Sequence, residues 1–333
     1  MSLDLSVDLA GVRFPTPVLV ASGCFGTGAE AAGLVDASTL GGIVTRTITP
    51  LPEKGAPTPR LAETPSGMLS SVGLQNPGVE AFLLQDLPPL AAFGVPIVVS
   101  VGGRTLDEFL TVASACARVP GIVALEAYLA SPDDEHSGKP FASRADVAAD
   151  VVGSVARVSG LPVFAKLPGV GSELVETASA CARAGAHGVT LIDGIPGMSV
   201  DAERLSSAVG PVVGGLTGPA IRPIAVRAVF EVTRALPGVP VMGVGGVRTG
   251  NDAVELLLAG AGAVQVGTAM LVDPSTPGIV LEGIRGYLEA KGLRSPAEVQ
   301  GRLQGRLHGR PRTSAPAPDP AARPAPRPAS RSS

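Results

Sequence analysis

The chain has 333 residues, with 45% hydrophobic and 3% aromatic residues, 43 glycines and a formal net charge of −3. A mildly acidic protein without a run of about 20 apolar residues is expected neither to bind nucleic acid nor to cross a membrane. Its three cysteines and three histidines are widely spaced, so neither a disulfide framework nor a metal site is indicated. The N-terminus does not have the pattern of a secretion signal, and we expect a cytoplasmic protein.

The predicted elements begin with a small β-hairpin at residues 5–14, which we expect to cap the bottom of the fold. Eight short apolar runs typical of strands follow, at residues 17–22, 42–48, 96–101, 122–129, 162–167, 188–193, 239–246 and 263–268. Helical spacing of apolar residues lies between them, at Thr105–Arg118, Arg144–Val158, Ser172–Ala184, Ile221–Leu236 and Asn251–Ala259. Eight strands that alternate with helices predict an α/β fold, a closed (β/α)₈ TIM barrel.

An open doubly wound sheet is the less favoured alternative, because ASGCFGTG after the first strand lacks the glycine spacing of a dinucleotide-binding turn. Three long connections, at residues 49–78, 130–143 and 194–220, follow strands and therefore belong to the face where barrel active sites form. We assign residues 1–309 to the barrel. Residues 310–333 are rich in Pro, Ala and Arg and predict a disordered tail, more simply a solvated extension than a contact for an acidic partner.

Glycines at the ends of two adjacent strands indicate a phosphate site. The seventh strand ends in Gly243, Val244, Gly245 and Gly246, and the eighth in Gly267 and Thr268. Glycine lets backbone amides approach an anion, and these two loops form the usual phosphate site of barrels. The simpler alternative is that the glycines only make tight turns. A third glycine-rich loop, 212–223, could close over the same ligand.

Lys166 lies at the end of an apolar strand, where a buried ammonium group requires an anionic partner. That partner is either a bound ligand or Glu126, which lies in another apolar strand. The two alternatives are compatible.

Several motifs together resemble a known family. They are ASGCFG (21–26), PTPRLAETPSGMLSSVGLQNPG (57–78), GGLTGPAIRP (214–223), GVGGV (243–247) and AVQVGTA (263–269). The chain resembles the class 1 dihydroorotate dehydrogenases over roughly residues 3–300, and is most similar to the NAD-linked 1B type. The resemblance implies a flavin enzyme that oxidises (S)-dihydroorotate to orotate in pyrimidine biosynthesis.

The resemblance also implies site residues. The FMN contacts would be Ser22, Arg46, Thr47, Ser100, Tyr128, Lys166, Ile192, Gly218, Gly245, Gly246, Gly267 and Thr268. The substrate contacts would be Arg46, Ser70, Ser71, Val72, Gly73, Leu74, Tyr128, Asp193 and Gly194. Ser131 would be the catalytic base, and Lys166 would stabilise the negative charge of the reduced flavin.

The chain departs from the family pattern mainly on the substrate side. Arg46 stands where the family has Lys, and Gly194 where it has Thr. Ser70, Ser100, Tyr128 and Asp193 stand where it has Asn. Ser131-Pro132-Asp133 replaces Cys-Pro-Asn, although class 2 relatives also use Ser as the base; the alternative is that Ser131 is only a polar turn residue. Asn can donate and accept hydrogen bonds together, which Ser, Tyr and Gly cannot reproduce at a pyrimidine edge.

Three functions therefore stay open at the level of sequence. The first is dihydroorotate oxidation, and the second is an FMN-dependent paralogue that acts on another small unsaturated or dihydro compound. The third is a barrel that binds flavin without catalysis. The resemblance further implies a homodimer or heterotetramer, with a possible FAD/iron–sulfur subunit that passes electrons to NAD.

Overall fold

The computed structural model describes residues 3–303, except residues 32, 170 and 172. The predicted tail, 310–333, and the last part of the predicted barrel region, 304–309, lie outside the described residues.

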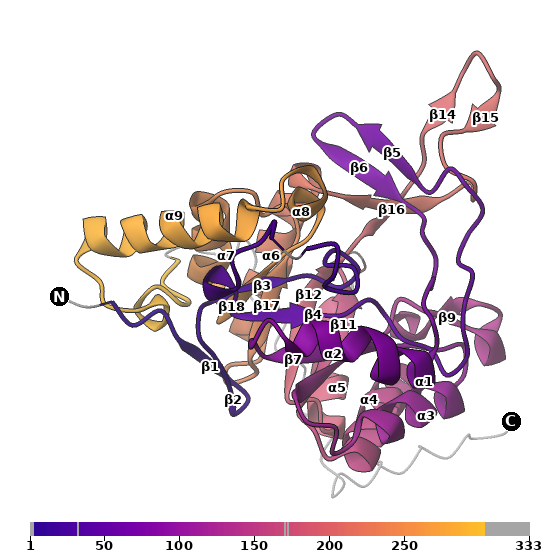
Figure 1. The fold of residues 1–333 in the computed structure, drawn as a ribbon, viewed down its shortest axis with the longest axis horizontal. Helices are drawn as coiled ribbons and strands as arrows, with labels where there is room; N and C mark the ends of the chain where they lie inside the picture. The colour runs from indigo at the N-terminus through magenta and orange to yellow at the C-terminus, as the bar shows by residue number, and fades with distance from the viewer. Residues whose placement is uncertain (1–2, 32, 170, 172, 304–333) are drawn as a thin grey trace, which may run out of the picture. The chain divides into compact units, whose positions relative to one another are not determined.

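Eight parallel strands close into a barrel, which confirms the predicted fold (Figure 1). Each predicted apolar run contains one of them, except that one strand extends a single residue beyond its run, to Pro168. Strands buried on both faces of a parallel sheet are rich in Val, Ile, Leu and Ala, so they can be recognised as apolar runs. Strand β18 pairs with β3 and closes the ring. In chain order the strands are β3 (Val18–Val20), β4 (Gly42–Val44), β7 (Ile97–Val101), β8 (Ile122–Tyr128), β11 (Val163–Pro168), β12 (Gly188–Asp193), β17 (Val241–Val244) and β18 (Ala263–Val266).

The five predicted helices are present: α3 (Leu106–Cys116), α4 (Ala145–Ser159), α5 (Leu174–Ala184), α6 (Arg222–Ala235) and α7 (Gly250–Ala259). Their ends follow local chemistry. The Thr105 hydroxyl accepts a hydrogen bond from the Glu108 amide at the start of α3, and Thr249 forms a capping box with Asp252 at α7. None of the described helices is both long enough and apolar enough to span a membrane.

Further helical segments were not predicted. They are α1 (Val79–Ala81), the π-helical turn η2 (Phe82–Asp86), α2 (Leu87–Ala91), α8 (Thr268–Val272) and α9 (Thr276–Lys291). Single 3₁₀ turns lie at η1 (Ala37–Thr39), η3 (Asp134–His136), η4 (Phe141–Ser143), η5 (Pro219–Ile221) and η6 (Pro296–Glu298).

The N-terminal hairpin closes the bottom of the barrel, as predicted. Strands β1 (Val7–Leu9) and β2 (Val12–Phe14) pair antiparallel. Their buried side chains pack against a layer of barrel residues that includes Leu19, Phe164 and Met242. This end of the barrel is a continuous apolar core, which leaves the opposite end for polar groups.

The long connections carry additional strands above the carboxyl ends of the barrel strands (Figure 1). Segments that follow β4 and β12 form a four-stranded sheet in the order β13 (Ile195–Gly197), β16 (Gly214–Thr217), β6 (Gly67–Ser70) and β5 (Leu61–Thr64). Two short hairpins accompany it: β14 (Val200–Asp201) with β15 (Ser206–Ser207), and β9 (Pro132–Asp133) with β10 (Lys139–Pro140). The three long loops therefore surround one end of the barrel.

Candidate active site

A cavity of about 1180 Å³ lies among the carboxyl ends of the barrel strands and the long connections. Ligand pockets are commonly ~300–1,000 Å³, so this volume suits a large ligand together with a small one. The cavity wall includes nearly every residue for which a role was predicted. These are Ser22, Arg46, Thr47, Ser70, Ser71, Val72, Gly73, Leu74, Tyr128, Lys166, Ile192, Asp193, Gly194, Gly218, Gly245, Gly246, Gly267 and Thr268.

The glycine loops after β17 and β18 line one part of this cavity. Gly245 and Gly246 have positive φ values of 128° and 77°, a backbone conformation that favours glycine. A Cβ atom on Gly246 would lie 2.6 Å from Cβ of Arg222, and one on Gly245 would lie 2.9 Å from Cβ of Ala225. A side chain at either position would thus displace α6. Both the conformation and the lack of space require glycine here, and bare backbone then faces the cavity.

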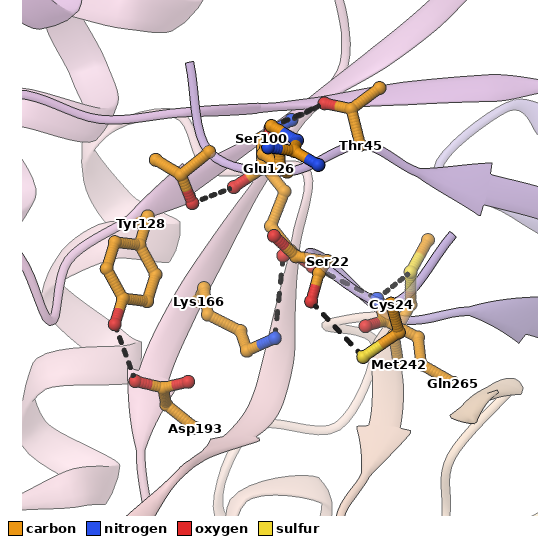
Figure 2. Close-up of polar contacts among 12 residues, drawn as sticks. Ser22, Cys24, Thr45, Ser100, Glu126, Tyr128, Lys166, Asp193, Met242 and Gln265 are labelled. Carbon is orange, nitrogen blue, oxygen red and sulfur yellow. Dashed lines mark hydrogen bonds and ion pairs between the residues drawn. The ribbon is translucent and has the colours of Figure 1, made fainter. Parts of the chain in front are cut away.

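Lys166 and Glu126 form an ion pair inside the barrel, with 3.5 Å between Nζ and Oε1 (Figure 2). Both side chains are almost inaccessible to solvent, and Gln265 donates a hydrogen bond of 3.0 Å to the other carboxylate oxygen of Glu126. Lys166 also contributes to the cavity wall. Lys166 can therefore interact with both of the partners considered for it. Glu126 forms the ion pair inside the barrel, and a ligand in the cavity could bind on the other side.

Gln265 was not predicted as part of the site. It is fully buried, and it lies within the apolar strand β18. The signal was present in the sequence, because a single amide inside an apolar strand has to find a polar partner. Its partner, Glu126, lies 139 residues away along the chain.

Arg46 follows β4 and places a positive charge in the cavity wall. Its guanidinium donates one long hydrogen bond, 3.4 Å from Nη1 to the backbone oxygen of Gln75, and its charge also acts to lower the pKa of the carboxyls of Glu30 and Asp86. Its Nε is buried and has no hydrogen-bond partner in the described part of the chain. A buried donor on a charged group is costly when unpaired, so this guanidinium suits an anionic ligand.

Tyr128 and Asp193 lie at the ends of β8 and β12 and are hydrogen-bonded, with 3.1 Å between the phenol oxygen and Oδ2 (Figure 2). Burial raises the pKa of the Asp193 carboxyl, and nearby Lys166 opposes this shift. The charge of Asp193, together with burial, raises the pKa of Tyr128 well above its usual value. At neutral pH Tyr128 is therefore a phenol.

Two predicted site residues lie behind the wall of the cavity. Ser100 is fully buried, and its hydroxyl is 2.9 Å from that of Thr47, so Ser100 reaches the cavity only through Thr47. Ser131 is also fully buried, while its neighbours Ala130 and Pro132 line the cavity. Among the described residues the Ser131 hydroxyl has no hydrogen-bond partner. The role of Ser131 as the catalytic base stays a prediction.

Cys24 is another wall residue without a predicted role. Burial raises the pKa of its thiol to about 11, although Lys166 lowers it somewhat. The thiol therefore stays protonated at neutral pH and is a poor nucleophile.

Comparison with known proteins decides the family. A sequence profile of the dihydroorotate dehydrogenases matches residues 4–288. The catalytic subunit of dihydroorotate dehydrogenase B (NAD(+)) from Desulforudis audaxviator is 43% identical over 301 residues, which cover 90% of this chain and 98% of that protein. The corresponding subunits from Geotalea daltonii and Bacillus thuringiensis are each 40% identical over 90% of this chain and 98% and 96% of their own lengths.

The chain belongs to the dihydroorotate dehydrogenase family. Dihydroorotate dehydrogenases are flavin-dependent oxidoreductases that act on CH–CH bonds. The described cavity fits a flavin in three respects: its volume, the glycine backbone that lines it in the loops after β17 and β18, and the buried ammonium group of Lys166. Anions bind well to such glycine loops, and a lysine beside the flavin ring can stabilise negative charge.

Proposed function

We propose that this chain is an FMN-dependent dihydroorotate dehydrogenase that oxidises (S)-dihydroorotate to orotate. The observation that carries the proposal is Arg46, whose guanidinium lies in the cavity wall with its buried Nε unpaired. A planar guanidinium binds a carboxylate through two parallel hydrogen bonds, and the dihydroorotate carboxylate is such a group. Family membership over 90% of the chain supports the same conclusion.

The cofactor in this proposal is FMN, which supplies a two-electron acceptor for hydride when it is bound. The loops at Gly245–Gly246 and Gly267–Thr268 would hold its phosphate, because their backbone can approach an anion closely. Lys166 would lie beside the ring, where its fixed positive charge favours the reduced, more negative form. Glu126 and Gln265 position this ammonium group from below.

The substrate would bind over the wall formed by Ser70–Leu74, Tyr128, Asp193 and Gly194, with its carboxylate on Arg46. The base at position 131 is predicted from the family alone. We further propose a cytoplasmic enzyme whose electrons leave through a separate FAD/iron–sulfur subunit, in a homodimeric or heterotetrameric assembly. The chain has only three cysteines, whereas iron–sulfur clusters are usually held by four, so such a cluster would have to belong to a partner.

A second candidate function is oxidation or reduction of a different small cyclic compound. The observation that favours it is the carboxylate of Asp193, which lies in the wall that would contact the substrate. Like charges repel, so the carboxylate of dihydroorotate is tolerated near the carboxylate of Asp193 only where Arg46 offsets the repulsion. A substrate with an N–H or cationic group facing Asp193 would avoid that cost.

A dye-linked assay separates the two candidates. Purified flavoprotein is given dihydroorotate and an artificial electron acceptor, so that no partner subunit is required. We expect dihydroorotate-dependent dye reduction. We also expect Arg46→Ala to raise the KM for dihydroorotate by about 10²-fold or more, because the substrate carboxylate loses its charged partner. A flavin-loaded protein that reduces the dye with another dihydro compound but not with dihydroorotate would favour the second candidate.

A further inference from the structure

Tyr128 and Asp193 form a hydrogen-bonded pair in the cavity wall. Their hydrogen bond joins two strand ends across the mouth of the barrel, at 3.1 Å. We propose that this pair is the general base of the reaction, with Tyr128 receiving the carbon-bound proton and Asp193 receiving the proton of Tyr128. The proposal rests on the proposed oxidation of a CH–CH bond.

The topology explains why these two residues meet. Tyr128 ends β8 and Asp193 ends β12, and β11 lies between these two strands in the barrel. Lys166 of β11 is in register with Tyr128. The tyrosine is long enough to span the intervening strand, so the pair and Lys166 contribute to the same wall of the cavity. A shorter side chain at position 128 could not reach Asp193.

A phenol alone is a poor base, because at neutral pH its oxygen already carries a proton. It can accept a second proton only while it releases its own, and the carboxylate of Asp193 is placed to receive that proton. In the proposed step the substrate C5–H bond breaks and its proton moves to the Tyr128 oxygen. The Tyr128 proton moves to Oδ2 of Asp193, and the electron pair of the C5–H bond forms the C5=C6 double bond. FMN, when bound, would supply the acceptor for the hydride from C6, which balances the oxidation.

The charges around the pair suit this role. Burial raises the pKa of Asp193 and so makes its carboxylate a stronger base than an exposed aspartate. The positive charge of Lys166 lowers the pKa of Asp193 and so favours the ionised carboxylate. The negative charge of Glu126 raises the pKa of Asp193. Asp193 and burial raise the pKa of Tyr128, so that the tyrosine carries its proton until the carboxylate takes it.

Ser131 is less suited to the same task in this structure. Its side chain is fully buried behind the wall, its backbone amide donates to the carbonyl of Tyr128, and its carbonyl accepts from the amide of Phe141. Its hydroxyl has no acceptor among the described residues to which it could pass a proton. A serine without such an acceptor is a weak base.

The first test measures the coupling between Tyr128 and Asp193 by ¹³C NMR and requires no substrate. The chain has only two tyrosines, Tyr128 and Tyr287, so tyrosine labelled with ¹³C at Cζ gives two resonances in the flavin-loaded protein. Tyr287→Phe assigns them. We expect Tyr128 to ionise well above the usual pH for a tyrosine, and Asp193→Asn to move the Tyr128 resonance and lower the pH at which it ionises. A Tyr128 resonance that does not respond to Asp193→Asn would overturn the pair.

The second test measures the rate of flavin reduction under anaerobic conditions as a function of pH. We expect Tyr128→Phe and Asp193→Asn to lower that rate by about 10²–10⁴-fold, the usual contribution of a general base. The wild-type rate should rise with pH as Asp193 ionises, and Asp193→Asn should abolish this rise. Tyr287→Phe is the matched control, because Tyr287 lies on α9, away from the cavity wall, and should leave the rate unchanged.

Ser131→Ala separates the two possible bases. The proposal predicts a much smaller loss for Ser131→Ala than for Tyr128→Phe, and the reverse order would overturn it. A wild-type flavin that dihydroorotate does not reduce would refute the proposed substrate, and the ¹³C measurement would then decide the pair alone. The two failures are therefore distinguishable.

Discussion

Asp193 lies in the cavity wall, where its carboxylate accepts a hydrogen bond from Tyr128. Its carboxylate lies in a wall where burial disfavours charge, and the phenol of Tyr128 and the ammonium group of Lys166 only partly compensate. Such groups concentrate where a protein performs chemistry, because a shifted pKa is what makes a side chain reactive. The same shift has a consequence for stability that is independent of any substrate.

Replacement of Asp193 by Asn should therefore stabilise the protein in a pH-dependent manner. Because the folded-state pKa is raised, the contribution of Asp193 to stability is favourable below its unfolded value of 3.8 and is lost as pH rises through the folded value. Asn does not titrate, yet it can still accept a hydrogen bond from Tyr128. We expect the melting temperature of Asp193→Asn, relative to wild type, to increase as the pH rises above about 4.

Scanning calorimetry at several pH values measures this difference. Asp150→Asn is the control, since it removes the same charge from an exposed position on α4. A melting-temperature difference for Asp193→Asn that stays flat or falls with increasing pH would show that burial does not disfavour the charged carboxyl.

At the scale of elements, two short loops do most to make the cavity suitable for a phosphate group. The loop after β17 requires glycine for both its backbone conformation and its packing, since α6 lies directly behind it. The loop after β18 leads directly into α8 and lines the same cavity. Because they follow neighbouring strands, the two loops meet at one place without any long side chain.

We expect Gly246→Ala to weaken FMN binding by about tenfold or more, because alanine is strained at a φ of 77° and its Cβ would collide with Arg222. Gly238→Ala is the matched control. Gly238 has a φ of 94°, but a Cβ there would meet nothing within 4 Å, and it lies away from the large cavity. The control should lose about 1 kcal/mol of stability and keep its FMN affinity.

Titration of the apoprotein with FMN, followed by quenching of flavin fluorescence, gives the two dissociation constants. Equal losses of FMN affinity in Gly246→Ala and Gly238→Ala would mean that Gly246 is required only for its backbone conformation. This outcome would favour the simpler alternative of tight turns without a phosphate.

The strands of the barrel and five of its helices could be predicted because their signals are local, although α9 was not predicted. A run such as PVFAKL is buried on both faces, and its apolar content alone indicates a strand. The sheet of β13, β16, β6 and β5 could not be predicted in this way. Its strands Gly67–Ser70 and Gly214–Thr217 are far apart in the chain, contain several glycines, and are fixed by pairing with one another.

The same distinction applies to the site. The wall position of Gly246 and Lys166 follows from their places at strand ends, which the sequence reveals. The contacts of Tyr128 with Asp193 and of Gln265 with Glu126 depend on which strands become neighbours in the closed barrel. The burial of Ser131 depends on the path of a loop, and no pattern in the sequence indicates it.

At the scale of the whole molecule, the barrel separates stability from chemistry. The N-terminal hairpin and an apolar layer fill the bottom, whereas the charged and glycine-rich residues collect at the top, where the long connections enclose the cavity. This division is general for such barrels, because side chains at the carboxyl ends of the strands point into the loop region. The chain can thus vary its substrate wall while it keeps the part that would hold FMN.

The most direct test of this account is a single turnover without oxygen. Protein loaded with FMN is mixed with a small excess of (S)-dihydroorotate, and the flavin absorbance near 450 nm is followed while orotate is quantified, as is usual for flavins reduced by their substrate. We expect full bleaching and one orotate formed for each flavin reduced. A flavin that stays oxidised while dithionite still reduces it would contradict the account.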